Sequence, residues 1–171
     1  MRNLFLIATF LLSFTAFNAS AQQAKIAHID YYSVVDSLPS KIAADREIKK
    51  FLKEGQEVVA QMEAQLEIDV QKYMAERETL SVVMQEVREK QLQEQSQIIE
   101  IKRQTLQQDL QVLNERLYAP IEENLQKAID IVAERYGVTY VLDKNQLLYV
   151  NGGLDLTDEV RKEMIKMETG G

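Results

Sequence analysis

The stretch that decides the fold is residues 56–119, which read QEVVAQMEAQLEIDVQKYMAERETLSVVMQEVREKQLQEQSQIIEIKRQTLQQDLQVLNERLYA. It contains no glycine and no proline, and the strong helix formers Glu, Gln, Leu, Met, Lys and Arg dominate it. This composition predicts long helix throughout. Both prolines, Pro39 and Pro120, and most glycines lie toward the two ends of the chain. We therefore expect a helical middle flanked by ends of a different kind.

The helical region is too long to be one helix of an ordinary domain. A continuous helix over residues 41–136 would be about 140 Å long at about 1.5 Å per residue. We predict instead a helical hairpin that reverses at residues 79–83, where hydroxyl and β-branched side chains interrupt the helix formers. Ser81 is placed to cap the returning helix. Residues 41–118 are predicted to form this arm.

Apolar residues repeat in steps of three and four on both halves of the arm, as in a coiled coil. The outgoing half carries Ile48, Leu52, Val59, Met62 and Leu66, and the returning half carries Leu106, Leu110, Leu113 and Leu117. Gly55 falls in the first of these seams, so the partner helix is expected to come close there. Residues 91–104 are rich in Gln and Glu and predict a weak middle of the seam.

The two ends of the chain have the pattern of short strands and turns. Residues 26–30 alternate like a strand, and residues 138–142 and 146–150 are predicted to form a β-hairpin. Gly137 is placed to end the returning helix, and Thr157 to cap a final amphipathic helix. Residues 22–40 and 119–171 are together predicted to form a β-containing body.

Three short strands leave exposed edges and an uncovered face, so we expect the body to oligomerise. The residues predicted for the oligomer body are Ile26, Ile29, Tyr140, Val141, Leu142, Leu148 and Val150. The predicted fold class is α+β and mostly α, with a long antiparallel, coiled-coil-like helical hairpin arm on a small β body that oligomerises.

Residues 1–21 have the pattern of a secretory signal peptide, with Arg2, an apolar run over residues 4–17 and an A-x-A cleavage site at residues 19–21. An uncleaved membrane anchor is the alternative, but the run is short for a membrane span. The chain has no cysteine, which excludes a lipid-modified cysteine, disulfides and thiolate metal sites. We therefore expect an unanchored protein of the cell envelope, without stable membrane insertion.

Acidic residues exceed basic ones. Without Arg2, the only charge in residues 1–21, the chain keeps 19 basic and 27 acidic residues and a net charge of −8. Residues 41–136 hold 14 basic and 19 acidic residues. This balance disfavours nucleic acid as a partner, and it disfavours an amphipathic protein that lies on anionic lipid.

No pattern of catalytic residues is present. The one histidine, His28, lies in the first predicted strand, and no nucleophile elbow or phosphate-binding glycine loop accompanies it. Acidic residues such as Glu63, Glu67 and Asp69 share helical faces at a spacing that their density explains. We therefore expect no enzymatic activity, no cofactor and no metal site.

The ends of the chain resemble the Skp/OmpH family. The stretches that carry the resemblance are Lys25-Ile26-Ala27-His28-Ile29-Asp30, Tyr140-Val141-Leu142-Asp143, Leu148-Tyr149-Val150 and Asp155-Leu156-Thr157-Asp158-Glu159-Val160. The resemblance implies a homotrimer in which three hairpin arms surround a cavity. It further implies an ATP-independent periplasmic holdase that binds unfolded outer-membrane β-barrel proteins.

One departure concerns a lipopolysaccharide site proposed for the family, which uses basic residues on the arms. Val112 and Leu113 stand where a basic pair would be expected, so we do not carry that site over. The arms resemble the family in length and helical character and not residue by residue.

Adjacent apolar residues point about 100° apart on a helix, so one member of each pair must leave a narrow seam. Methionine and tyrosine suit a surface that binds many sequences. The residues predicted to contact unfolded clients are Tyr73, Met74, Val82, Val83, Met84, Val87, Ile98, Ile99 and Ile101. Two alternatives stay open, namely that these residues form a wider hairpin core, and that the protein is an envelope coiled-coil adaptor without chaperone activity.

Overall fold

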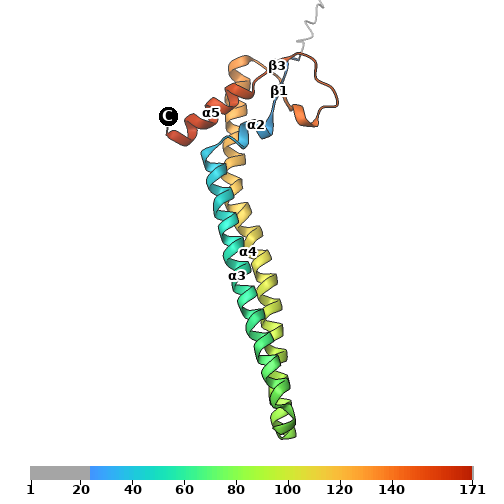
Figure 1. Cartoon of the computed structure of the whole chain (residues 1–171). Helices are drawn as coiled ribbons and strands as arrows, with labels where there is room; N and C mark the ends of the chain where they lie inside the picture. The colour runs from blue at the N-terminus through green and yellow to red at the C-terminus, as the bar shows by residue number, and fades with distance from the viewer. Residues whose placement is uncertain (1–23, 171) are drawn as a thin grey trace, which may run out of the picture.

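The computed structural model describes residues 24–170, and the predicted signal peptide lies outside the described residues. Two long helices, α3 (Pro39–Glu76) and α4 (Val82–Tyr136), run side by side in opposite directions and form the arm (Figure 1). A 3-10 turn, η1 (Arg77–Thr79), joins them. Ser81 is the N-cap of α4, and its hydroxyl accepts a hydrogen bond from the Met84 N–H at 3.4 Å. The predicted hairpin and its reversal are confirmed.

The two helices of the arm meet along a seam with a seven-residue repeat. Val59 and Tyr73 of α3 and Ile99 and Leu113 of α4 are buried in this seam. Burying one such apolar side chain contributes about 1.5–3 kcal/mol relative to leaving it in water. Gly55 lies against Leu106, whose side chain occupies the place that a Cβ at position 55 would take. The predicted close approach at Gly55 is confirmed.

The seam becomes polar at the level of Asp69 and Gln95. The Gln95 Nε2 donates to Asp69 Oδ2 at 3.1 Å, but Gln95 Oε1 is buried without a partner in the described part of the chain. An unsatisfied buried acceptor costs about 1–3 kcal/mol. This polar layer lies in the part of the seam, residues 91–104, that the sequence predicts to be weak.

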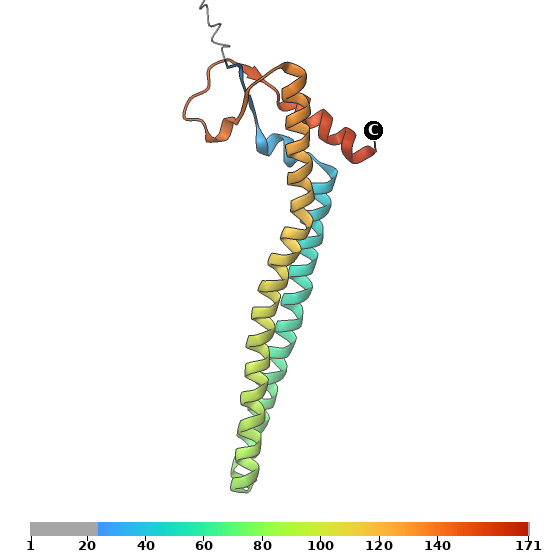
Figure 2. The same ribbon diagram turned by 180° about the vertical axis from the view of Figure 1, so that it is seen from behind.

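The body contains a three-stranded parallel sheet in the order β2-β1-β3, with β1 (Ile26–Ile29) between β2 (Tyr140–Asp143) and β3 (Leu154–Asp155). The short helix α2 (Tyr31–Val35), the final helix α5 (Thr157–Thr169) and the last turns of α4 pack against one another and the sheet at this end of the arm (Figure 2). The largest fully buried side chains of this core are Leu38, Leu156, Met164, Val34, Val132 and Val160. The body thus has a core of its own at the base of the arm.

The predicted β-hairpin of residues 138–142 and 146–150 is wrong in its second strand and in its pairing. The Asp143 carboxylate accepts the Asn145 N–H at 3.0 Å, and the chain enters a 3-10 turn, η2 (Lys144–Gln146). Residues 147–150 then run without strand pairing, and β2 pairs with β1 in parallel. The alternation of residues 146–150 suits a strand, but within one chain it finds no neighbouring strand to pair with.

The two predicted helix boundaries in the body have different outcomes. Gly137 ends α4 in the left-handed conformation at φ 61°, as predicted. Thr157 does not cap α5, because it is the first residue of the helix and Leu156 stands at the N-cap position without a side-chain cap. The Thr157 N–H donates to Asp155 Oδ1 at 2.9 Å. The Thr157 hydroxyl instead accepts the Asp30 N–H at 2.9 Å and ties α5 to the end of β1.

Candidate functional site

The predicted client-contact residues separate into buried and exposed groups. Tyr73 and Ile99 are only 8% and 5% exposed because they pack in the seam, so they leave the set of available contact residues. The Tyr73 hydroxyl donates to Glu89, and this hydrogen bond raises the pKa of Tyr73. The seven exposed members are Met74, Val82, Val83, Met84, Val87, Ile98 and Ile101.

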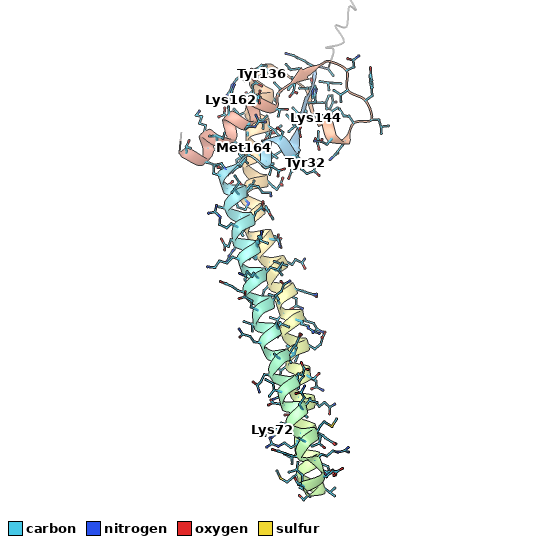
Figure 3. The ribbon with its side chains drawn as sticks, viewed as in Figure 1. Tyr32, Lys72, Tyr136, Lys144, Lys162 and Met164 are labelled. Atoms are coloured by element: carbon cyan, nitrogen blue, oxygen red, sulfur yellow. The ribbon has the colours of Figure 1, made fainter. Side chains whose placement is uncertain are left out.

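These seven exposed residues lie in two parts of the arm. Next to the reversal, Met74 stands in the last turn of α3, and Val82, Val83, Met84 and Val87 stand in the first turns of α4. Ile98 and Ile101 lie farther along α4. Figure 3, in which Lys72 marks the distal part of the arm and Met164 the body, shows side chains projecting along the whole arm. The arm therefore offers many separate apolar contacts along its length.

Sequence reasoning missed four exposed apolar residues of the arm, Ile42, Val58, Ile68 and Val112. Val58 lies next to Val59, and Val112 next to Leu113, and in each pair only the second residue is buried. Val58 and Val112 could therefore have been found in the same way as Ile98, because each is one of two adjacent apolar residues on a helix, of which only one can enter the seam.

Several grooves with apolar floors open between α3 and α4, and exposed large apolar residues line two of them. The basal groove, near the body, has a volume of about 350 Å³, with Phe51, Val112 and Leu113 among its lining residues. Its charged lining residues are Glu47, Lys50, Glu54, Asp109 and Arg116. The middle groove has a volume of about 220 Å³ and is lined by Met62, Gln65, Leu66, Gln95, Ile98 and Ile99. Both are open furrows that suit single side chains better than a whole small molecule.

The predicted oligomer-body residues also fall into two groups. Ile29 is buried in the core of the chain itself, and Val141 packs against that core. Ile26, Tyr140, Leu142, Leu148 and Val150 are exposed, with Leu148 at 106%. The sheet thus has one face covered by its own helices, while apolar side chains on its other side and in the following loop meet solvent.

Charged groups close the edge of the body beside β2. Lys144 Nζ lies 2.8 Å from Asp30 Oδ2, and the Asn145 side chain donates to Asp30 Oδ1 at 3.0 Å. The bonds from Lys144, Asn145 and the Ser33 N–H together lower the pKa of Asp30 to about 2. This network fixes the turn after β2 to the end of β1.

His28 lies in a structural environment. Its Nε2 is 3.6 Å from Asp155 Oδ2, and Gly153 lies beside the ring. The Thr157 hydroxyl donates to Asp155 and not to His28, whereas a catalytic triad requires the nucleophile to contact the histidine. Residues 24–170 contain no group of three or more His, Asp or Glu side chains placed to hold a metal ion. No helix in this range combines the length and apolarity of a membrane span.

A two-helix arm with exposed apolar side chains, standing on a small parallel sheet, defines the class of the protein as an arm-bearing α+β protein. Residues 25–164 match the family model described as outer membrane protein (OmpH-like). The chain therefore belongs to the OmpH-like family, and the resemblance found at its ends is confirmed.

Named relatives and a solved structure agree with this assignment. The chain is 27% identical to the chaperone protein Skp of Photorhabdus luminescens over 165 residues, 96% of this chain and 99% of that protein. It is 27% identical to the chaperone protein Skp of Pectobacterium atrosepticum over 150 residues, 87% of this chain and 91% of that protein. The crystal structure of an OmpH-like chain from Caulobacter crescentus CB15 superimposes with a TM-score of 0.74 at 17% identity, covering 84% of this chain and 85% of that one. The fold of arm and body is thus a family fold.

Proposed function

We propose that the protein is an ATP-independent holdase of the periplasm that binds unfolded outer-membrane proteins between the arms of a homotrimer. The observation that carries the proposal is the run of exposed apolar side chains along the arm, from Val112 near the body to Val83 near the reversal. Clustered exposed apolar residues mark interaction sites, and Val82, Val83, Met84 and Val87 are four such residues within two turns of α4. The membership in a family whose named relatives are chaperones supports the same function.

The uncovered side of the body supports self-association. Tyr140 and Leu148 are 56% and 106% exposed, and residues 147–150 have no strand partner within residues 24–170. A second copy can cover these side chains and give the unpaired backbone a partner, as exposed strand edges do. The trimer as the particular assembly comes from the family resemblance, and the periplasmic location from the signal-peptide pattern of residues 1–21.

Many weak contacts, repeated on several arms, add up without any one of them being specific. Such binding needs no nucleotide and suits clients that share only unfolded apolar segments. The individual client contacts are assigned to the exposed residues Met74, Val82, Val83, Met84, Val87, Ile98 and Ile101.

The test is light scattering of a urea-unfolded outer-membrane β-barrel diluted into buffer, with and without the signal-less protein and with no nucleotide. We expect aggregation to be suppressed at one oligomer per client. Unchanged aggregation in the presence of a well-folded oligomer would contradict holdase function and favour the coiled-coil adaptor.

A further inference from the structure

Four exposed apolar residues of the arm, Val58, Met84, Ile98 and Val112, share one side of it. Both seams repeat every seven residues, as Val59, Leu66 and Tyr73 on α3 and as Ile99, Leu106 and Leu113 on α4. Residues at steps of seven therefore stay at a constant position relative to the seam. This allows each row of exposed residues to be assigned to one side of the hairpin.

The side on which the basal and middle grooves open is here named the groove side. Its row on α3 contains residues 51, 58, 65 and 72, and its row on α4 contains residues 84, 91, 98, 105 and 112. The two rows face each other across the grooves, because Phe51 and Val112 line the basal groove together, and Gln65 and Ile98 the middle one. Lys72, labelled in Figure 3, faces Gln91 at a third, more polar groove.

The groove side is apolar from the base of the arm to its middle. Phe51 is half-buried, while Val58, Ile98 and Val112 are 42%, 54% and 64% exposed. The polar members Gln65 and Thr105 stand between these apolar residues. The row ends near the reversal with Met84, which is 43% exposed.

The opposite side of the arm has a different composition. Its rows contain Arg46, Lys53, Ala60, Glu67 and Met74 on α3, and Glu86, Gln93, Glu100, Gln107 and Asn114 on α4. The groove on this side has a volume of about 310 Å³, and the seam residues Leu52, Val59, Leu106 and Leu110 form its apolar floor. Its other lining residues are Gln56, Ala60, Gln107 and the ion pair of Arg103 with Glu63. Met74 is the one large apolar residue of these two rows.

We propose that the groove side binds one extended segment of an unfolded polypeptide, and that Met74, the assigned contact residue on the opposite side, contacts this segment less than the groove side does; this inference rests on the holdase function proposed above. Ile98 and Val112 are about 21 Å apart along α4 at about 1.5 Å per residue. An extended chain covers that distance in about six residues at about 3.4 Å each. Side chains of an extended chain alternate between two faces, so two side chains that are six residues apart point to the same face. The segment therefore carries two apolar side chains about six residues apart.

The size of the apolar surface favours an extended segment over a folded partner. A stable interface between folded proteins buries about 800 Å² on each partner. On α4 of the groove side, exposed apolar residues alternate with Gln91 and Thr105 at seven-residue steps, and the basal and middle grooves hold only about 350 and 220 Å³. Such separated furrows accept single side chains of an extended chain.

The charges around the basal groove indicate which kind of client residue lies next to the apolar side chain that enters this groove. Arg116 lies 3.2 Å from Glu47, and Lys50 lies 3.8 Å from Glu54, so both cations of the groove have carboxylate partners. Asp109 has no ion-pair partner within residues 24–170 and leaves the groove with a net negative charge. The complementary segment has a Lys or Arg beside the apolar residue that enters this groove.

The test uses Val112 and Met74, which are both 64% exposed and lie on opposite sides of the arm. A photo-crosslinking phenylalanine derivative is placed at one or the other position in the full mature oligomer, which is then mixed with the urea-unfolded β-barrel. We expect severalfold more client crosslinked from position 112. Equal yields, a higher yield from position 74 or no yield from position 112 would overturn the inference.

The outcomes separate this inference from the holdase function. Suppressed aggregation without crosslinks at position 112 leaves the holdase standing and removes the groove side as its contact surface. Crosslinks at position 112 without suppression would retain the surface and remove the holdase function.

The charge requirement is tested with two labelled peptides that carry Leu residues six apart and a Lys or a Glu beside the first. The Lys peptide should bind about two- to fivefold more tightly, the size expected of an exposed ion pair. Asp109→Asn should remove that difference. Equal binding of both peptides to the unmodified protein would overturn this part of the inference.

Discussion

Leu106 of the returning helix packs directly over Gly55 of the outgoing one, in the space that any side chain at position 55 would need. This contact sets how closely α3 and α4 approach in the half of the arm near the body. The seam residues on both sides of it, Leu52 and Val59 on α3 and Leu113 on α4, are drawn together by the same approach.

Gly55→Ala should therefore lower the stability of the arm despite the better helix propensity of alanine. Propensity favours the substitution by about 1 kcal/mol, while overpacking against Leu106 costs about 1–3 kcal/mol. Chemical denaturation of Gly55→Ala, Leu106→Ala and the double variant measures their coupling. We expect the double variant to be more stable than the sum of the single effects by at least about 0.5 kcal/mol, and additive effects would contradict the contact.

Gln95→Leu should stabilise the middle of the arm. The substitution removes a buried acceptor without a partner and extends the apolar seam, for an expected gain of about 1 kcal/mol. Asp69 keeps its hydrogen bond from Gln65 at 3.0 Å, so its carboxylate is not left without a donor. Amide hydrogen exchange should slow in residues near position 95 and stay unchanged in α5. Faster exchange near position 95 would show that the amide is satisfied in solution.

Lys144→Met should raise the pKa of Asp30 from about 2 toward its ordinary value of 3.8, because Lys144 is the largest cause of the lowered value. A lowered carboxyl pKa stabilises the fold above the unfolded pKa, and this stabilisation is lost as the pH falls through the folded one. The stability difference between the natural chain and the variant should thus be full above about pH 4 and shrink between about pH 4 and pH 2. NMR titration of the Asp30 carboxyl measures the shift directly, and an unchanged value would contradict the contact with Lys144.

Leu148→Asp should dissociate the oligomer while leaving each chain folded. Leu148 is fully exposed in the single chain, so the substitution removes no contact within it, whereas a charge buried between copies is costly. Sedimentation measures the mass, and far-UV circular dichroism the helix content. Ile68→Asp, on the exposed surface of α3 in the arm, is the matched control and should keep the oligomer. An unchanged mass for Leu148→Asp would place the interface elsewhere.

Local signals in the sequence predicted the arm, because its structure depends on residues near one another in the chain. The glycine-free and proline-free run, Ser81 and Gly137 each act within a few residues, and the structure uses all of them. The adjacent pair Ile98 and Ile99 shows the limit of this reasoning. One member had to leave the seam, but only the pairing of α3 with α4 decides that Ile99 is the buried one.

The body was harder to predict because its contacts join distant parts of the chain. Residues 146–150 alternate like a strand, yet β1 already pairs with β2 and β3, so they have no strand to join within one chain. Thr157 looks like a helix cap, but its hydroxyl is used by Asp30, which is 127 residues away in sequence. A local sequence pattern does not show which of several distant segments a strand or a hydroxyl group pairs with in the folded chain.

The central claim is that an assembly of several arms encloses one unfolded client. Native mass spectrometry of the mature chain, mixed with a urea-unfolded outer-membrane β-barrel, tests it most directly. The account predicts a complex of three chains with one client and no nucleotide. A single chain in solution, or a trimer that passes through the mixture without a client, would contradict it.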